Sequence, residues 1–383
     1  MAPNVVDTSR NQPTLVEQGV ENEFDSKEEE IRKRVVSTKS QNQSEVNEPI
    51  SPWYSRLEDI KWFNVIFITI LHIAAVYAFF TLPYIRCWRT FIWTYIIGFL
   101  GGFGITGGVH RLWSHKAYKA NTAMRIFLAF CYSCAGLNSL HEWIKDHRVH
   151  HKYSETDADP HNSTRGFFFS HCGWLMQKKH PEVIRKGKQI DFSDIEADEV
   201  ITFFEKYFGI MRVMFSYVIP IVVPVYFWNE EWKYAILFQV FRYVLVLNSV
   251  WSTNSVAHMF GNKPYDQSIA PVENFIVAVF ALGEGWHNYH HTFPYDYRAS
   301  EVGKGLINPT THLIDLFSKI GWAYDCKVPS ESLLKMTIVK RGNGTHEYSK
   351  IMRKKSGNVG KDTVTEDTKE CINTSYEWCL AET

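Results

Sequence analysis

The chain has 383 residues, and its 41 Lys and Arg balance 41 Asp and Glu, so the formal net charge is zero. A neutral chain has no overall field that would gather nucleic acid, and we expect no nucleic-acid partner. The seven cysteines are an odd number spread along the chain, which excludes a disulfide framework and favours a reducing environment.

The first 50 residues are rich in Asn, Gln, Ser, Glu and Lys. Such a composition buries too little apolar surface to order itself, so we expect residues 1–50 to form a disordered leader. The start of the chain also lacks a basic segment followed by an apolar core, and it does not match a cleaved secretory signal. Membrane insertion would therefore depend on internal segments.

Four apolar runs follow, although the mean hydropathy of the whole chain is only −0.21. Each is near the ~20 residues that cross the hydrocarbon core of a bilayer. They lie at about residues 62–84, 91–109, 213–228 and 232–252. Short polar links join the first two runs and the last two, which predicts two hairpins with both termini on one side of the membrane.

The segment between the two hairpins, residues 110–211, carries many Lys and Arg and is expected in the cytosol by the positive-inside tendency. Arg86 and Arg89 in the outer link oppose this tendency. Two shorter apolar stretches, 122–140 and 275–282, are expected at the interface or packed under the polar part rather than across the bilayer.

These patterns predict an all-α membrane protein with four transmembrane helices in two hairpins, capped by a cytosolic helical domain. The membrane domain would cover residues 51–327. Residues 328–383 would form a polar C-terminal tail, because no hydrophobic periodicity is evident there.

Eight of the sixteen histidines fall into three short motifs, HRLWSH, HRVHH and HNYHH. Histidines at i, i+3 and i+4 share one face of a helix, so each of the last two motifs can direct three imidazoles at one place. In the first motif the spacing is five, and one histidine should lie where the helix ends or bends. The motif residues are His110, His115, His147, His150, His151, His287, His290 and His291.

Imidazole suits iron, zinc, copper and nickel, so the histidines alone do not identify the metal. Eight ligands exceed what one zinc ion uses, which favours two metal ions.

The order and spacing of the motifs resemble the integral-membrane acyl-CoA desaturases of the stearoyl-CoA desaturase group. The resemblance extends from about Pro52 to Lys327 and includes GFFFSHCGWL, NSVAHMFGNKPYD and GEGWHNYHHTFPYDYR. The first motif departs from the family pattern in having Val109 where alanine is usual, which is a conservative change.

The resemblance implies a di-iron site, with His258 as a ninth ligand and Asn254 bound to one iron through a water. It assigns one iron to His110, His115, His147, His151 and one of His290 and His291. The other iron would have His150, His258, His287 and the remaining histidine. No glutamate is assigned as a bridging ligand.

The family pattern also implies that dioxygen is the co-substrate and that a fatty acyl-CoA is the substrate. Electrons would come from NADH through a reductase and cytochrome b5, a separate protein because no HPGG haem motif occurs here. Residence in the endoplasmic reticulum is implied in the same way. Contacts with the acyl-CoA are expected from Asn64, Asn138, Trp143, Lys145, Asp146, Lys178, Lys179 and Trp251.

Other polar residues have simpler readings. His72, His141, His161, His171, His180 and His312 are expected to be structural or solvated. Asp157, Asp159 and Asn162 fit two roles equally, as partners that orient imidazoles or as turn formers around Pro160.

Two other functions share parts of the pattern. A membrane di-iron hydroxylase or sterol oxidase would use similar histidine motifs, and a metal-transport or storage protein would also need clustered histidines. The stretch KPYDQSIAPVEN resembles insect acyl-CoA desaturases, which act at Δ9 or, in pheromone synthesis, at Δ11. On general similarity we favour the pheromone-type group.

Overall fold

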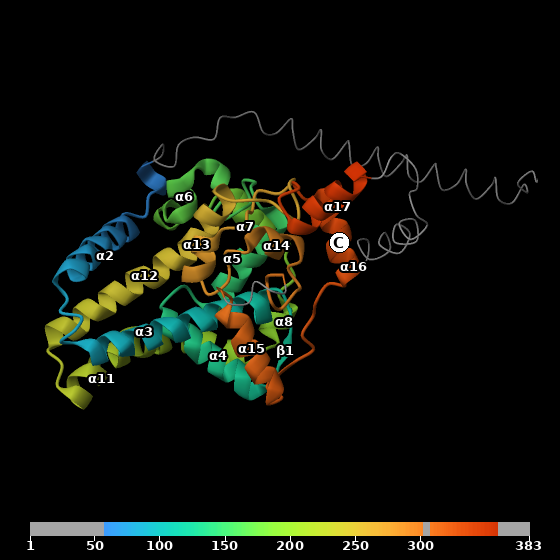
Figure 1. The fold of residues 1–383 in the computed structure, drawn as a ribbon. Helices are drawn as coiled ribbons and strands as arrows, with labels where there is room; N and C mark the ends of the chain where they lie inside the picture. Colours follow the sequence, from blue (N-terminus) through green and yellow to red (C-terminus); the bar gives the residue numbers. More distant parts are fainter. Residues whose placement is uncertain (1–56, 302–306, 359–383) are drawn as a thin grey trace, which may run out of the picture. The chain divides into compact units, whose positions relative to one another are not determined.

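The computed structural model describes residues 57–301 and 307–358 of the chain. The expected leader, residues 1–50, lies outside the described residues. Within them the fold is almost entirely helical (Figure 1), with one two-stranded antiparallel pairing. In chain order the elements are η1(Leu57–Asp59), α2(Trp62–Thr81), α3(Trp88–Phe103), η2(Gly104–Ser114), β1(Lys119–Ala120), α4(Thr122–Ala135), α5(Leu140–Tyr153), η3(Ser163–Arg165), α6(Phe167–His171), η4(Gly173–Met176), α7(Pro181–Gly187), α8(Ser193–Glu196), α9(Glu199–Lys206), α10(Phe208–Arg212), η5(Val213–Val218), α11(Ile219–Trp228), α12(Trp232–Met259), α13(Phe275–Phe280), α14(His287–Thr292), α15(Pro309–Lys319), β2(Ala323–Tyr324), α16(Glu331–Arg341) and α17(Glu347–Asn358).

Four continuous helices among the described residues are long and apolar enough to cross a membrane, which confirms the predicted fold class. They are Trp62–Thr81, Trp88–Ser114, Phe208–Trp228 and Trp232–Met259. Large apolar side chains cover their outer faces, and Phe63 and Phe80 are 77% and 78% exposed. Such surfaces are stable in lipid and would be costly in water.

Two of these helices continue well past the predicted ends of the apolar runs. The second reaches Ser114 instead of about residue 109, and the fourth reaches Met259 instead of about residue 252. The added turns carry polar and histidine side chains, which lower hydropathy without interrupting the helix. Hydropathy marks the hydrocarbon boundary and not the helix end, and these extra turns are the ones that carry His110 and His258 into the polar part.

A buried arginine fastens the fourth helix to its neighbours. Arg242 of α12 donates hydrogen bonds to the Cys134 carbonyl at 2.8 Å, to the Ser216 carbonyl at 3.0 Å and to Gln239 Oε1 at 3.0 Å. A charged group inside a membrane helix is tolerated when its donors are satisfied by the protein. These bonds fix α12 against α4 and η5.

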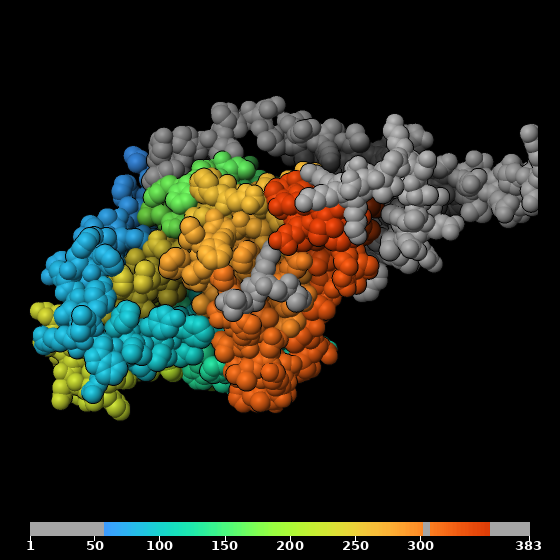
Figure 2. All heavy atoms as spheres, viewed as in Figure 1, coloured from blue at the N-terminus to red at the C-terminus, as the bar shows by residue number. Residues whose placement is uncertain are grey.

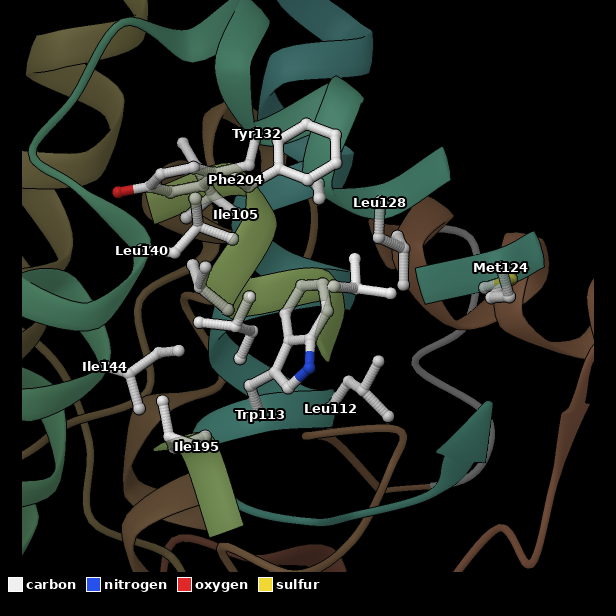
Figure 3. Packing of buried hydrophobic residues seen from close by; sticks show 14 of the residues in the cluster. Ile105, Leu112, Trp113, Met124, Leu128, Tyr132, Leu140, Ile144, Ile195 and Phe204 are labelled. Atoms are coloured by element: carbon white, nitrogen blue, oxygen red, sulfur yellow. The ribbon is translucent and has the colours of Figure 1, made fainter. Parts of the chain in front are cut away.

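An apolar core supports the polar end of the second helix (Figure 3). Trp113 of η2 packs in it with Leu128 of α4, Ile144 of α5 and Phe204 of α9. Each of these side chains is at most 5% exposed. The core therefore holds η2, α4 and α5 as one body and positions the first two histidine motifs relative to each other.

The predicted polar tail differs from the structure between residues 328 and 358. Ile338 of α16 is buried against Tyr265, Tyr289 and Phe293, and Arg341 forms an ion pair with Asp266. The red C-terminal segment lies directly against the orange residues that precede it (Figure 2). Sequence periodicity missed this helix because only Thr337 and Ile338 of α16 are buried, a stripe too narrow to show a pattern.

Replacing Ile338 with Ala is expected to lower the free energy of unfolding by about 2–4 kcal/mol, the usual cost of a cavity at a buried isoleucine. Thermal unfolding of the detergent-purified protein measures this loss. The neighbouring Val339→Ala is the control, because Val339 is 51% exposed. Equal unfolding temperatures for the two variants would mean that α16 does not stabilise the domain.

Candidate metal centre

Nine histidines converge in two groups. The five-histidine group contains His110, His115, His147, His151 and His290, and the four-histidine group contains His150, His258, His287 and His291. Within each group one imidazole nitrogen from every member lies within 4.8 Å of the others. The contributing elements η2, α5, α12 and α14 are far apart in the sequence and meet in the middle of the molecule (Figure 1).

A π-helix explains the five-residue spacing of the first motif. η2 is a π-helix over Gly104–Ser114, and the His115 backbone N–H donates to the His110 carbonyl at 3.2 Å. One π turn brings residues i and i+5 together, so both imidazoles reach the same group. The expectation that one histidine lies at a helix end is confirmed, because His115 is the C-terminal cap.

Glycine is required at one position of this π-helix. A Cβ built on Gly104 would lie 2.1 Å from the backbone nitrogen of Tyr132. Only a residue without a side chain lets η2 approach α4 this closely. This close contact determines how near the first histidine motif lies to the apolar core.

The second and third motifs each divide their histidines between the groups. On α5, His147 and His151 join the five-histidine group, and His150 points to the other. On α14, His290 joins the five-histidine group, and His287 and His291 join the four-histidine group. The structure thereby groups His290 and His291, which the sequence left open.

The Nε2 atoms of the histidines face one another across each group. In the five-histidine group, Nε2 of His290 lies 2.9 Å from that of His110 and 3.0 Å from that of His151. In the four-histidine group, Nε2 of His287 lies 3.0 Å from that of His258 and 3.1 Å from that of His291.

Three carboxylates lie against Nδ1, the outward ring nitrogen, of three of these histidines. Glu284 lies 2.9 Å from Nδ1 of His110. Asp159 lies 2.9 Å from Nδ1 of His150, and Glu155 lies 2.7 Å from Nδ1 of His258. A carboxylate partner places the proton on Nδ1 and leaves a lone pair on Nε2. Inward lone pairs at such short range repel one another unless a cation lies between them, so these side chains fit metal ions.

Burial favours the neutral form of six imidazoles in the two groups. Burial, followed by the neighbouring histidines, lowers the pKa of each well below its usual value; they are His115, His147, His151, His287, His290 and His291. Neutral imidazole is the form that binds metal.

Sequence reasoning missed the roles of Glu155 and Glu284, because their histidine partners are distant in the sequence and no local motif connects them. The sequence predicts two roles for Asp159, as an imidazole partner or as a turn former, and the structure shows contacts of both kinds. Its carboxylate contacts His150, and it also accepts from the backbone N–H groups of Glu155 and His161 in a turn. His161 packs against His150 with 4.3 Å between ring centroids.

Asp159→Asn is expected to weaken metal binding to the four-histidine group by about 10–100-fold, the usual effect of losing a carboxylate that orients a ligand histidine. The asparagine amide would also place its own N–H donor beside the backbone N–H groups of Glu155 and His161. Metal retained per chain against a graded series of chelator concentrations measures the loss. Asp157→Asn is the matched control, since Asp157 is exposed; identical retention in both variants would contradict the role of Asp159.

An apolar cavity of about 310 Å³ begins at the histidines and extends between α3 and α12. Its volume is at the lower end of the ~300–1,000 Å³ typical of ligand sites. Near the histidines it is lined by Trp143, Asn254 and Glu284, and further along by Gly98, Phe238 and Phe91. Asn254 lines the same cavity as His150 and His287, and its contact with a metal through a water stays a prediction. The lining of the cavity could not be predicted from the sequence.

The eight residues expected to contact the acyl-CoA have different surroundings. Trp143 lines the cavity and stacks on His147. Lys179 is engaged by Asp146 at 2.6 Å, and Lys178 is 63% exposed in its side chain and 3.7 Å from Asp59.

The remaining members of that set are placed as follows. Asn64 donates to the Leu175 carbonyl at 2.7 Å, which anchors α2 to η4. Lys145 lies over the Phe192 ring at 5.7 Å. Trp251 is only 3% exposed and packs between His72 and His171. The Asn138 carbonyl accepts a hydrogen bond from Tyr132.

The fatty acid desaturase family model matches residues 85–299. The chain is 48% identical to an acyl-CoA Delta-9 desaturase of Acheta domesticus over 80% of this chain and 86% of the relative. It is 48% identical to stearoyl-CoA desaturase 5 of Bos taurus, covering 75% and 86%, and 44% identical to an acyl-CoA Delta(11) desaturase of Spodoptera littoralis, covering 75% and 85%.

Proposed function

Because the chain belongs to the fatty acid desaturase family, we propose that it is an acyl-CoA desaturase that forms a carbon–carbon double bond in a fatty acyl chain. The observation that carries this function is the pair of histidine groups beside an apolar cavity. A long aliphatic substrate could reach both groups there without exposing its reacting carbons to water.

The nine histidines would hold two iron ions, one in each group, with Asn254 contacting one of them through a water. Iron with dioxygen supplies the oxidising power that no side chain has. The overall balance removes two hydrogens from adjacent methylenes and reduces one dioxygen to two waters. Two of the four electrons come from the substrate, and the other two, with two protons, come from a donor.

The protein's own residues would bind and orient the substrate. The apolar walls of the cavity exclude water and hold one methylene pair beside the histidines, since geometry must choose among chemically identical carbons. Trp143 borders both the cavity and His147, so it would shape the path past the metals. Exposed Lys178 and the Lys179–Asp146 pair would contact the phosphate-bearing head, with help from Asn64, Asn138, Lys145 and Trp251.

The donor would be cytochrome b5 with its NADH-dependent reductase. The four spanning helices make the protein multi-pass, and the Lys and Arg content of residues 110–211 supports a cytosolic active site. We propose residence in the endoplasmic reticulum membrane with both termini in the cytosol. The double bond would form at Δ11 or Δ9, the positions at which the relatives from Spodoptera littoralis and Acheta domesticus are named to act.

Expression in a desaturase-deficient yeast tests the function. The lipids are analysed for new alkenes by mass spectrometry of disulfide adducts, with His150→Ala as the inactive variant and His180→Ala, at an exposed histidine, as the matched control. We expect an alkene from the unmodified protein and from the control only. An alcohol in place of an alkene would identify a hydroxylase, and no product from iron-loaded protein would contradict the proposal.

A further inference from the structure

The third histidine motif lies on a very short helix. α14 has six residues, and no side chain caps its N-terminus. A helix of this length is not stable by itself, because fixing its first turn costs more than its few hydrogen bonds return. The positions of His287, His290 and His291 must therefore come from contacts between α14 and the rest of the protein.

Two of these histidines lack the support that carboxylates give elsewhere in the centre. Nδ1 of His287 and Nδ1 of His290 are buried, and neither has a hydrogen-bond partner among the described residues. By contrast, a carboxylate faces Nδ1 of His110, of His150 and of His258. An imidazole with no such partner is oriented only by its backbone and its packing.

Asn288, which follows His287, fixes that backbone. Its side chain is fully buried, at 0% exposure. The side-chain oxygen accepts from the backbone N–H groups of Tyr265 and Asp266 at 2.9 and 3.1 Å, and the side-chain nitrogen donates to the carbonyls of Asp266 and Pro271 at 2.8 and 3.0 Å. These four bonds fill the capacity of a primary amide, which has two donors and two acceptor sites.

The loop at the other end of these bonds is itself fixed by the C-terminal helix α16. Arg341 forms an ion pair with Asp266, and its carbonyl accepts from the Gln267 N–H at 2.9 Å. Just after α16, the Asn343 N–H donates to the Lys263 carbonyl at 3.0 Å. The loop therefore has the support that it needs to serve as an anchor for α14.

We propose that Asn288 is a positioning residue that aligns His287 and His291 for the metal ion of the four-histidine group. The inference rests on the metal centre of the proposed function. His287 and His291 lie one turn apart on one face of α14, and Asn288 projects from another face, so it acts through the helix backbone. Two of the four histidines of this group come from α14, whereas the five-histidine group takes only His290 from it.

Titration with Co²⁺, followed by visible absorbance, tests this role in the full-length protein after its metal has been removed by a chelator. In Asn288→Ala one of the two Co²⁺ ions should bind about 10–100-fold more weakly, the usual effect of losing a group that orients ligand histidines. Its absorbance should also change, because ligand geometry changes. The other ion should be unaffected, since four of the five histidines in its group lie outside α14. Asn288→Asp keeps the size of the side chain but loses both donors, and should weaken the same ion.

Asn274→Ala is the matched control. Its side chain accepts from the Val277 N–H at 3.0 Å and donates to the Phe260 carbonyl at 2.7 Å, and neither bond reaches α14. This variant should lose stability and keep its Co²⁺ affinity. Asn288→Ser retains one hydroxyl and should weaken the same ion by about tenfold, so it provides the test if the alanine variant does not fold.

Unchanged Co²⁺ affinity in the folded Asn288 variants would overturn the positioning role and leave the desaturase function standing. An equal loss of affinity in Asn274→Ala would also overturn it, because general destabilisation would then explain the effect. An unmodified protein that binds no Co²⁺ would overturn both the positioning role and the metal centre on which the proposed function depends.

Discussion

Replacing His258 with Ala is expected to release about one iron ion per chain and to abolish alkene formation, whereas His115→Ala should abolish the reaction while keeping most of the iron. The difference follows from the ligand counts. Removing the His115 side chain leaves four imidazoles in its group, and removing the His258 side chain leaves three. Four imidazoles can complete a tetrahedral site, whereas three leave one position to water and hold the metal with one bond fewer.

Iron per chain after gel filtration, measured by elemental analysis, separates the two outcomes. Both variants should lose activity, because each displaces a metal from the position where the substrate carbons are held. His180→Ala serves as the control for the loss of an exposed histidine. If both ligand variants lost iron equally, the two groups would not act as separate sites of unequal strength.

The histidine motifs contain eight of the nine histidines that converge in the two groups, because helical spacing at i, i+3 and i+4 is a local property. The division between groups is not local. His290 and His291 are adjacent in the chain, and only the orientation of α14 toward α5 and α12 decides which group each one joins. The five-residue spacing in the first motif indicated a departure from a regular helix without revealing a π-helix.

The carboxylates behind the histidines could not be predicted for the same reason. Glu155 reaches His258 from 103 residues away, and Glu284 meets His110 only after the chain has crossed the bundle. Hydropathy located four membrane segments, since burial in lipid depends on composition. It did not find where α12 ends or that α16 packs on the third motif, since both depend on tertiary contacts.

Arg111→Met is expected to destabilise the protein by about 3–5 kcal/mol, the usual consequence of leaving one partner of a buried ion pair without the other. Arg111 is 1% exposed and donates to Glu284 Oε1 at 2.7 and 3.1 Å. It also donates to the Tyr297 carbonyl, to Thr311 and to Asn308. Although burial alone would raise the pKa of the Glu284 carboxyl, Arg111 and His110 hold that pKa well below its usual value.

Without the guanidinium, Glu284 would be a buried charge with only His110 beside it, and protonation of that carboxyl would disturb the imidazole that it orients. Denaturant or thermal unfolding in detergent measures the loss of stability, and iron per chain reports on the five-histidine group. In the double variant Arg111→Met with Glu284→Gln, most of the stability should return, because no unpaired charge remains. Iron binding should recover only in part, since a neutral amide orients His110 less strongly than a carboxylate does. A double variant as unstable as Arg111→Met alone would show that the hydrogen bonds to Tyr297, Thr311 and Asn308, and not the ion pair, hold the first motif in place.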